Sequence, residues 1–205
     1  QDSSVGMYKA VELSRRFNYA LGLEIEAIVE PFNHEQHIRH AHNTVIIGAV
    51  DNWLARKAMA KAEGAIWIDC GNSIKSGQVV IGSTGDVERM KYVMQNINPR
   101  RKSISKLPHA GLVYPELLVS DPEEELLAET LSCAELLERS LQSATINQFV
   151  ASIASEYLRK LLYREAIYTW FTNISTTSLT MKSTPITLDT LTRHTAGLSH
   201  IAKAQ

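Results

Sequence analysis

The chain has 205 residues, 44% of them hydrophobic and 21% charged, which is enough for one substantial core and indicates a single globular domain. Its 21 basic and 22 acidic side chains nearly cancel, so charge gives no sign of binding to nucleic acid or to an anionic membrane. No apolar run approaches the ~20 residues that span a bilayer, and no basic segment followed by an apolar one opens the chain. We therefore predict a soluble, cytoplasmic protein whose partner is a small molecule or another protein.

The first predicted elements are a helix and a strand. Apolar residues recur at helical spacing over residues 5–21, and Gly22 supplies a stop. Residues 23–29 then alternate apolar and acidic side chains, the period of a strand with one solvated face, and Pro31 ends it.

A second strand and helix meet at Asp51. Residues 44–50 form a continuous apolar run, which predicts a central, parallel strand buried on both faces, and residues 52–63 form a helix ended by Gly64. Ligands of parallel α/β sheets lie beyond the carboxyl ends of strands, so a carboxylate here can hold Mg²⁺ or a nucleotide. The alternative is that Asp51 only caps the helix.

The rest of the chain predicts more strands around a long connection. Residues 65–70 and 78–82 are short apolar strands, joined by a polar turn that favours an antiparallel pair. Residues 83–128 lack a regular pattern and predict a long excursion over the surface. Helices are expected over 134–141 and 144–163, and strands over 167–174 and 178–188. The order of elements predicts an α/β fold, a mostly parallel sheet with helices on both faces and an antiparallel C-terminal part.

Three landmarks occur in order along the chain. They are VGMYKA at residues 5–10, Asp51-Asn52 with Arg56, and WIDCGN at residues 67–72 running into GQVV at 77–80. Together they resemble the ThiF/MoeB/HesA family of adenylyltransferases, which are related to ubiquitin-activating enzymes, and are most similar to its plasmid-associated PRTRC-system branch. The likeness covers about residues 3–82 and extends more loosely through residues 132–135 to the helix at Ala144.

The resemblance implies a specific reaction. Family members bind ATP and Mg²⁺ and adenylate the C-terminal glycine carboxylate of a small ubiquitin-like protein, and they are commonly homodimers. Lys9 matches the family lysine that reaches the triphosphate, and Asp51 matches the aspartate that orders Mg²⁺ and the nucleotide. Asn52 and Arg56 belong to the same motif and are expected to bind the cofactor or to hold that loop and helix in place.

The chain also departs from the family. Relatives carry, ahead of the first helix, a glycine-rich phosphate loop, an acidic residue for the ribose and an arginine that contacts phosphate, and this sequence has none of these. The resemblance therefore implies a Rossmann-like adenylation domain over residues 1–205 with a crossover loop at about 83–132 and without its N-terminal βαβ portion. We expect these residues alone to bind ATP poorly. The two Cys-x-x-Cys pairs that bind zinc in many relatives are also missing.

The cysteines and histidines give weaker signals. Cys133 is predicted at a helix N-terminus, where a lowered thiol pKa favours thioester chemistry, although an ordinary helix-start cysteine fits as well. Cys70 follows an apolar strand and is expected to be an inert, buried thiol. Histidines 34, 37, 40 and 42 allow a metal site, but a polar helix face fits them better.

Two functions from different classes follow. The first is activation of a ubiquitin-like protein through an acyl-adenylate, with Lys9, Asp51 and Cys133 as catalytic candidates. The second is a non-catalytic, protein-binding module that has kept the sheet but lost ATP handling. A nicotinamide-dependent enzyme is disfavoured because the chain has no Gly-x-Gly-x-x-Gly.

Overall fold

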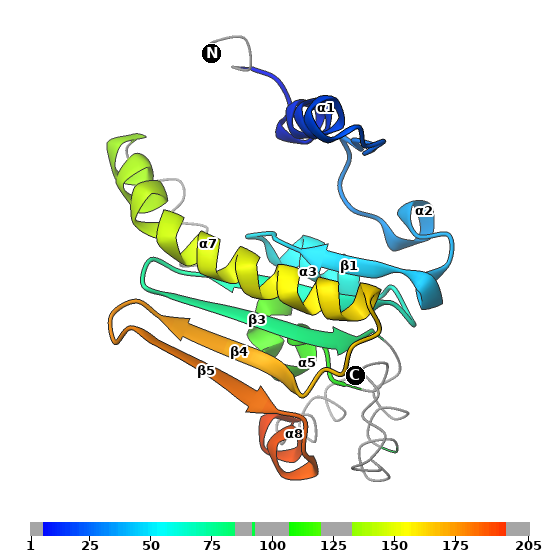
Figure 1. The fold of residues 1–205 in the computed structure, drawn as a ribbon, viewed down its shortest axis with the longest axis vertical. Coiled ribbons are helices and arrows are strands. Elements are labelled where there is room, and N and C mark those ends of the chain that lie inside the picture. The colour runs from blue at the N-terminus through cyan, green and yellow to red at the C-terminus, as the bar shows by residue number, and fades with distance from the viewer. Residues whose placement is uncertain (1–5, 85–91, 93–106, 120–132, 196–205) are drawn as a thin grey trace. The chain divides into compact units, whose positions relative to one another are not determined.

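The computed structural model describes residues 6–84, 92, 107–119 and 133–195 (Figure 1). The chain divides into two compact units, Gln1–Phe32 and Asn33–Gln205.

The first unit contains helix α1 (Lys9–Leu21), as the periodicity predicted. Gly22 ends the helix in the left-handed region, at φ 64°, and its N–H donates to the carbonyl of Asn18. The strand predicted over residues 23–29 is wrong, because no ladder partner pairs with it among the described residues. The Asn18 side chain instead bonds both the N–H and the carbonyl of Ile25, at 2.7 and 2.9 Å.

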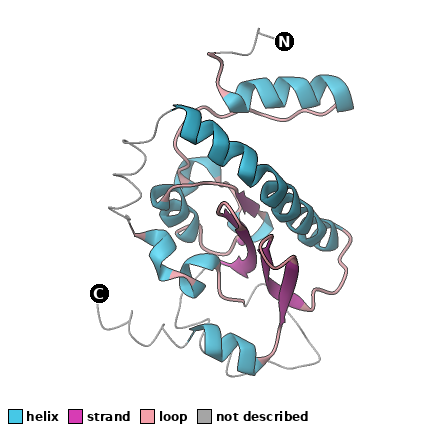
Figure 2. Cartoon of the chain, turned by 90° about the vertical axis from the view of Figure 1, so that its left-hand side faces the viewer, coloured by secondary structure: helices cyan, strands magenta, loops and turns pink. Residues whose placement is uncertain are grey.

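The second unit contains a five-stranded sheet and its helices (Figure 2). In chain order its elements are α2 (His34–His37), η2 (Ala41–Asn43), β1 (Val45–Gly48), α3 (Trp53–Ala60), β2 (Ile66–Asn72), β3 (Ser76–Ser83), α5 (Ala110–Val113), η4 (Pro115–Leu118), α7 (Cys133–Leu162), β4 (Thr169–Ser175), β5 (Thr180–Pro185) and α8 (Leu188–Thr195).

The strands follow one another across the sheet in sequence order, β1-β2-β3-β4-β5. Of the strand pairs in the described sheet, only β1 and β2 are parallel, and the three other pairs are antiparallel. The fold is therefore mixed α/β, and the prediction of a mostly parallel sheet needs correction. The links at 73–75 and 176–179 are too short for the crossover that parallel strands require, so both form antiparallel hairpins.

Strand β1 lies at the edge of the described sheet and not at its centre. Its side chains alternate in burial, and Ile47 is 47% exposed. The prediction of a central strand buried on both faces was wrong because an apolar run shows that a strand avoids water but not how many strands pair with it.

Helices cover both faces of the sheet, as predicted (Figure 1). Helix α7 packs on β2, β3 and β4, and Gly77 of β3 lets Ile146 and Val150 of this helix approach closely. On the other face lie α3, α5 and α8. The two helices predicted for 134–141 and 144–163 are one helix of 30 residues, since neither glycine nor proline interrupts it.

The predicted excursion at 83–128 is only partly described, and its buried part was not foreseen. Leu107 and Ala110 are 1% exposed and Leu112 is 8% exposed, so residues 107–113 pack on the sheet. The Ser83 N–H donates to the carbonyl of Leu107 at 2.9 Å, which joins the segment to the end of β3. The basic residues 100–102 lie outside the described residues.

No helix in the described part of the chain combines the length and the apolar character that crossing a membrane would need.

Candidate functional site

The carboxyl end of β1 leads directly into α3, as the sequence predicted. Asn52 caps the helix: its side-chain oxygen accepts the N–H of Ala55 at 2.8 Å. The capping alternative for Asp51 therefore does not apply. Asp51 is exposed, and no hydrogen bond or ion pair of its carboxylate is found among the described residues.

Arg56 lies just inside α3 and turns into the protein. Its side chain is 9% exposed, and its Nε donates to Oδ1 of Asp69 at 3.2 Å. Asp69 lies in the middle of β2 with its side chain fully buried. This ion pair joins the first turns of α3 to the second strand of the sheet.

In the described part of the chain, Arg56 is the one side-chain partner of the Asp69 carboxylate. Its Oδ2 atom is buried and has no hydrogen bond among the described residues. Burial raises the pKa of Asp69, while the charge of Arg56 and the hydrogen bond from it lower that pKa. Because an unpaired buried charge is costly, the state of this carboxylate depends on Arg56.

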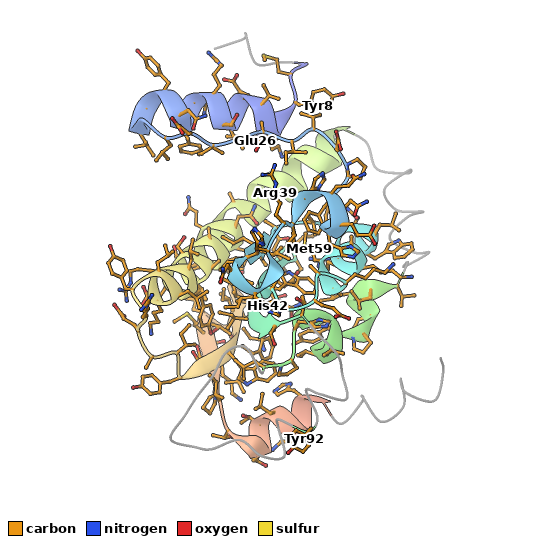
Figure 3. The ribbon with its side chains drawn as sticks, turned by 90° about the vertical axis from the view of Figure 1, so that its right-hand side faces the viewer. Tyr8, Glu26, Arg39, His42, Met59 and Tyr92 are labelled. Carbon is orange, nitrogen blue, oxygen red and sulfur yellow. The ribbon has the colours of Figure 1, made fainter. Side chains whose placement is uncertain are left out.

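Gly48 leaves space that the side chains of Trp67, Met59 and Asp69 occupy. It pairs with Asp69 in the parallel ladder, and a Cβ on Gly48 would lie 2.7 Å from Nε1 of Trp67, 2.9 Å from Sδ of Met59 and 3.4 Å from Oδ1 of Asp69. Met59, labelled in Figure 3, is buried, with 5% of its surface exposed. Side chains of α3 and β2 thus meet over Gly48 of β1, which has no side chain of its own.

His109 completes the buried cluster on this face. Its ring lies 5.4 Å from that of Trp67, centroid to centroid, and burial lowers its pKa to about 4. The imidazole is therefore neutral at physiological pH. Neither Nδ1 of His109 nor Nε1 of Trp67 has a hydrogen-bond partner among the described residues.

The other predicted site residues lie elsewhere in the chain. Lys9 is exposed at the start of α1, in the first unit. Cys133 is the first described residue of α7, which agrees with its predicted place in a helix, but its side chain lies outside the described residues. Cys70 is partly buried, and burial raises its pKa to about 11, as expected of an inert thiol.

The histidine alternative gains no support from the structure. His34 and His37 lie in α2, and Nδ1 of His37 accepts the N–H of Asn33 at 3.1 Å. Among the described residues, no group of three or more histidine, cysteine, aspartate or glutamate side chains is placed to hold a metal.

Asp69 is the residue that sequence reasoning missed. In the sequence it is part of the landmark at residues 67–72. An acidic residue inside the apolar run 65–70 is itself a signal of a buried carboxylate. A carboxylate in a buried strand needs a partner of opposite charge. Arg56, the basic residue of the Asp51-Asn52 landmark, was the candidate for that partner.

Comparison with known proteins adds no family assignment: neither the family models nor the curated proteins gave a match to this chain.

Proposed function

We propose that this protein activates the C-terminal carboxylate of a small ubiquitin-like protein by adenylating it with ATP. The proposal rests on the resemblance of the three landmarks to the ThiF/MoeB/HesA family. The observation that supports it best is the state of Asp51: Asn52 does the capping, so the aspartate keeps an exposed carboxylate at the carboxyl end of a parallel strand.

The residues at this end of the sheet fit the chemistry of a magnesium nucleotide. Mg²⁺ is usually bound by one or two carboxylates together with substrate phosphates and water, so a single carboxylate such as Asp51 suits it. The ion would offset charge on the triphosphate. In the family that the chain resembles, the lysine that Lys9 matches reaches the triphosphate, and an ammonium group stabilises the charge that develops as pyrophosphate leaves.

The reaction proceeds by displacement at phosphorus. The partner's carboxylate oxygen attacks the α-phosphorus of ATP, a new P–O bond forms, and the bond to pyrophosphate breaks. Where a thioester follows, the thiolate of Cys133 attacks the acyl carbon, AMP leaves with the electron pair of the broken C–O bond, and the acyl group remains on sulfur. The protein's own contribution is to place the reacting groups and to supply charge beside the phosphates.

The test is ATP–pyrophosphate exchange by the full-length protein, with and without candidate small proteins that end in glycine. We expect exchange that requires such a partner and Mg²⁺, and a loss of at least about 100-fold in Asp51→Asn. The matched control is Glu63→Gln, an exposed acidic residue beyond the other end of α3, which should keep wild-type exchange. Exchange that survives in Asp51→Asn would contradict the assigned role.

Cys133→Ala separates the two steps. It should abolish any thioester with the partner while sparing exchange, because adenylation precedes attack by the thiol. A full-length protein that binds the small partner but neither binds ATP nor exchanges pyrophosphate would instead support a non-catalytic binding module.

A further inference from the structure

Asp69 is a charged group that stability alone does not explain. Its side chain is fully buried in a strand whose neighbours Trp67 and Ile68 are both 0% exposed. Taking a carboxylate and a guanidinium out of water is costly for each ion, and well-packed apolar residues in their place are often neutral or stabilising. Because a buried ion pair is weak evidence for stability, this pair is a candidate for holding the segments that carry it in place.

The Arg56–Asp69 pair connects the two ends of the short link between β1 and α3. Asp69 is in register with Gly48, the last residue of β1, and Arg56 lies in α3 four residues after its cap, Asn52. Residues 49–52, which include Asp51, are the whole connection between β1 and α3. Neither end of the link can therefore shift relative to the sheet without breaking the ladder or the ion pair.

The close packing around Gly48 makes this arrangement specific. Trp67 and Met59 both approach within 3 Å of the point that a Cβ on Gly48 would occupy. Rotation of α3 about its axis would move Met59 into the strand or withdraw it from Gly48. The ion pair and the apolar contacts thus define one orientation of α3 over the sheet.

We propose that Asp69 is a positioning residue that, through Arg56, holds the first turns of α3 and the adjoining Asp51 at the carboxyl end of β1. Asp69 cannot itself touch a nucleotide, because it has no exposed surface. This inference rests on the proposed function for its catalytic consequence, since Asp51 is the proposed magnesium ligand.

The test compares Asp69→Asn with wild type in the full-length protein. Asparagine keeps the size of the side chain but loses the charge that pairs with Arg56. We expect the Mg²⁺ concentration for half-maximal pyrophosphate exchange to rise about tenfold or more, with kcat changed less than about threefold, because a misplaced ligand weakens binding first. The matched control is Asp189→Asn, the same change in an exposed ion pair of α8, which should alter neither quantity.

Backbone amide NMR shifts provide a second measurement that needs no activity. In Asp69→Asn they should change most at residues 49–56, with the rest of the sheet less affected. If Asp69→Asn does not fold, the double variant R56M/D69L, which replaces the pair by apolar side chains, should show the same rise in Mg²⁺ requirement and the same local shifts.

The outcomes distinguish the two proposals. Unchanged Mg²⁺ dependence and unchanged amides at 49–56 in a folded variant overturn the positioning role. A uniform loss of kcat, or shifts spread over the whole sheet, also overturns it, because those results mark general stability. If the wild type shows no exchange, the proposed function fails, and the location of the amide shifts alone decides whether Asp69 positions this link.

Discussion

Replacing Arg56 with Met should make the stability of the second unit strongly pH-dependent. The change removes the only hydrogen-bond partner of the Asp69 side chain found among the described residues and leaves a carboxylate without exposed surface in the sheet. Breaking a buried ion pair from one side costs about 3–5 kcal/mol. For a protein of this size that lowers the unfolding temperature by about 6–20 °C, at about 2–4 °C per kcal/mol.

The direction of the pH effect follows from the pKa of Asp69. Burial already raises this pKa above the ordinary 3.8, and Arg56→Met removes both influences that lower it. The folded variant then holds a proton more tightly than the unfolded chain. Its stability is greatest at low pH and falls as the pH rises from about 3.8 through the raised folded pKa.

The assay is urea unfolding at pH 5 and pH 8, followed by tryptophan fluorescence. All three tryptophans, residues 53, 67 and 170, lie in the second unit, so the signal reports that unit alone. Arg159→Met is the matched control: it removes an arginine that is 44% exposed and paired with Glu156 and Glu165, which should cost no more than about 1 kcal/mol. The double variant R56M/D69L should regain most of the stability that R56M loses.

Two results would refute this reasoning. One is an Arg56→Met protein whose stability at pH 8 lies within about 1 kcal/mol of wild type. The other is a deficit of the same size at pH 5 and pH 8, which would mean that the lost packing of the arginine, and not the stranded carboxylate, causes it.

Three further predictions concern packing and the thiol. Gly82→Ala should cost about 1–3 kcal/mol or more of unfolding free energy, because its Cβ would collide with the backbone of Pro108; urea unfolding measures this, and a neutral variant would contradict the close approach. Ile146→Ala should cost about 2–5 kcal/mol, since this residue of α7 has no exposed surface; a loss below about 1 kcal/mol would show that α7 does not pack as described. In a Cys133→Ala background, alkylation of Cys70 should be slow at pH 8 and accelerate toward its pKa of about 11, and a rate equal to that of a free cysteine at pH 8 would show that the thiol is not buried.

The elements with strong local signals could be predicted from the sequence. The stop at Gly22 works through the backbone freedom of glycine, and α1 ends there. The short links between β2 and β3 and between β4 and β5 determine antiparallel pairing without reference to the rest of the chain. These features depend on residues within a few positions of one another.

The errors arose where distant residues decide the outcome. Alternation over 23–29 describes a side-chain pattern, but a strand exists only where another strand supplies the ladder. Strand β1 is apolar enough for the centre of a sheet, yet lies at the edge of the described one. Pairing partners are set by the fold as a whole, which local composition does not contain.

The site was predicted in part for the same reason. The place of Asp51 after a strand and before a helix is local, and the structure has it there. The pairing of Arg56 with Asp69 joins residues 13 positions apart, across a helix and a strand, and could not be read from spacing alone. Whether Asp51 or Asn52 caps α3 also depended on backbone geometry, since either side chain can serve.

The hydrogen bond between Ser83 and Leu107 has a consequence for how this gene can vary. It joins residues 24 positions apart, and the entropy lost on bringing two points of a chain together grows only with the logarithm of the number of residues between them. Doubling that number would cost only about 0.6 kcal/mol. A change in the length of chain between these two anchors therefore matters less for stability than whether the segment from Leu107 to His109 can still dock against Gly82.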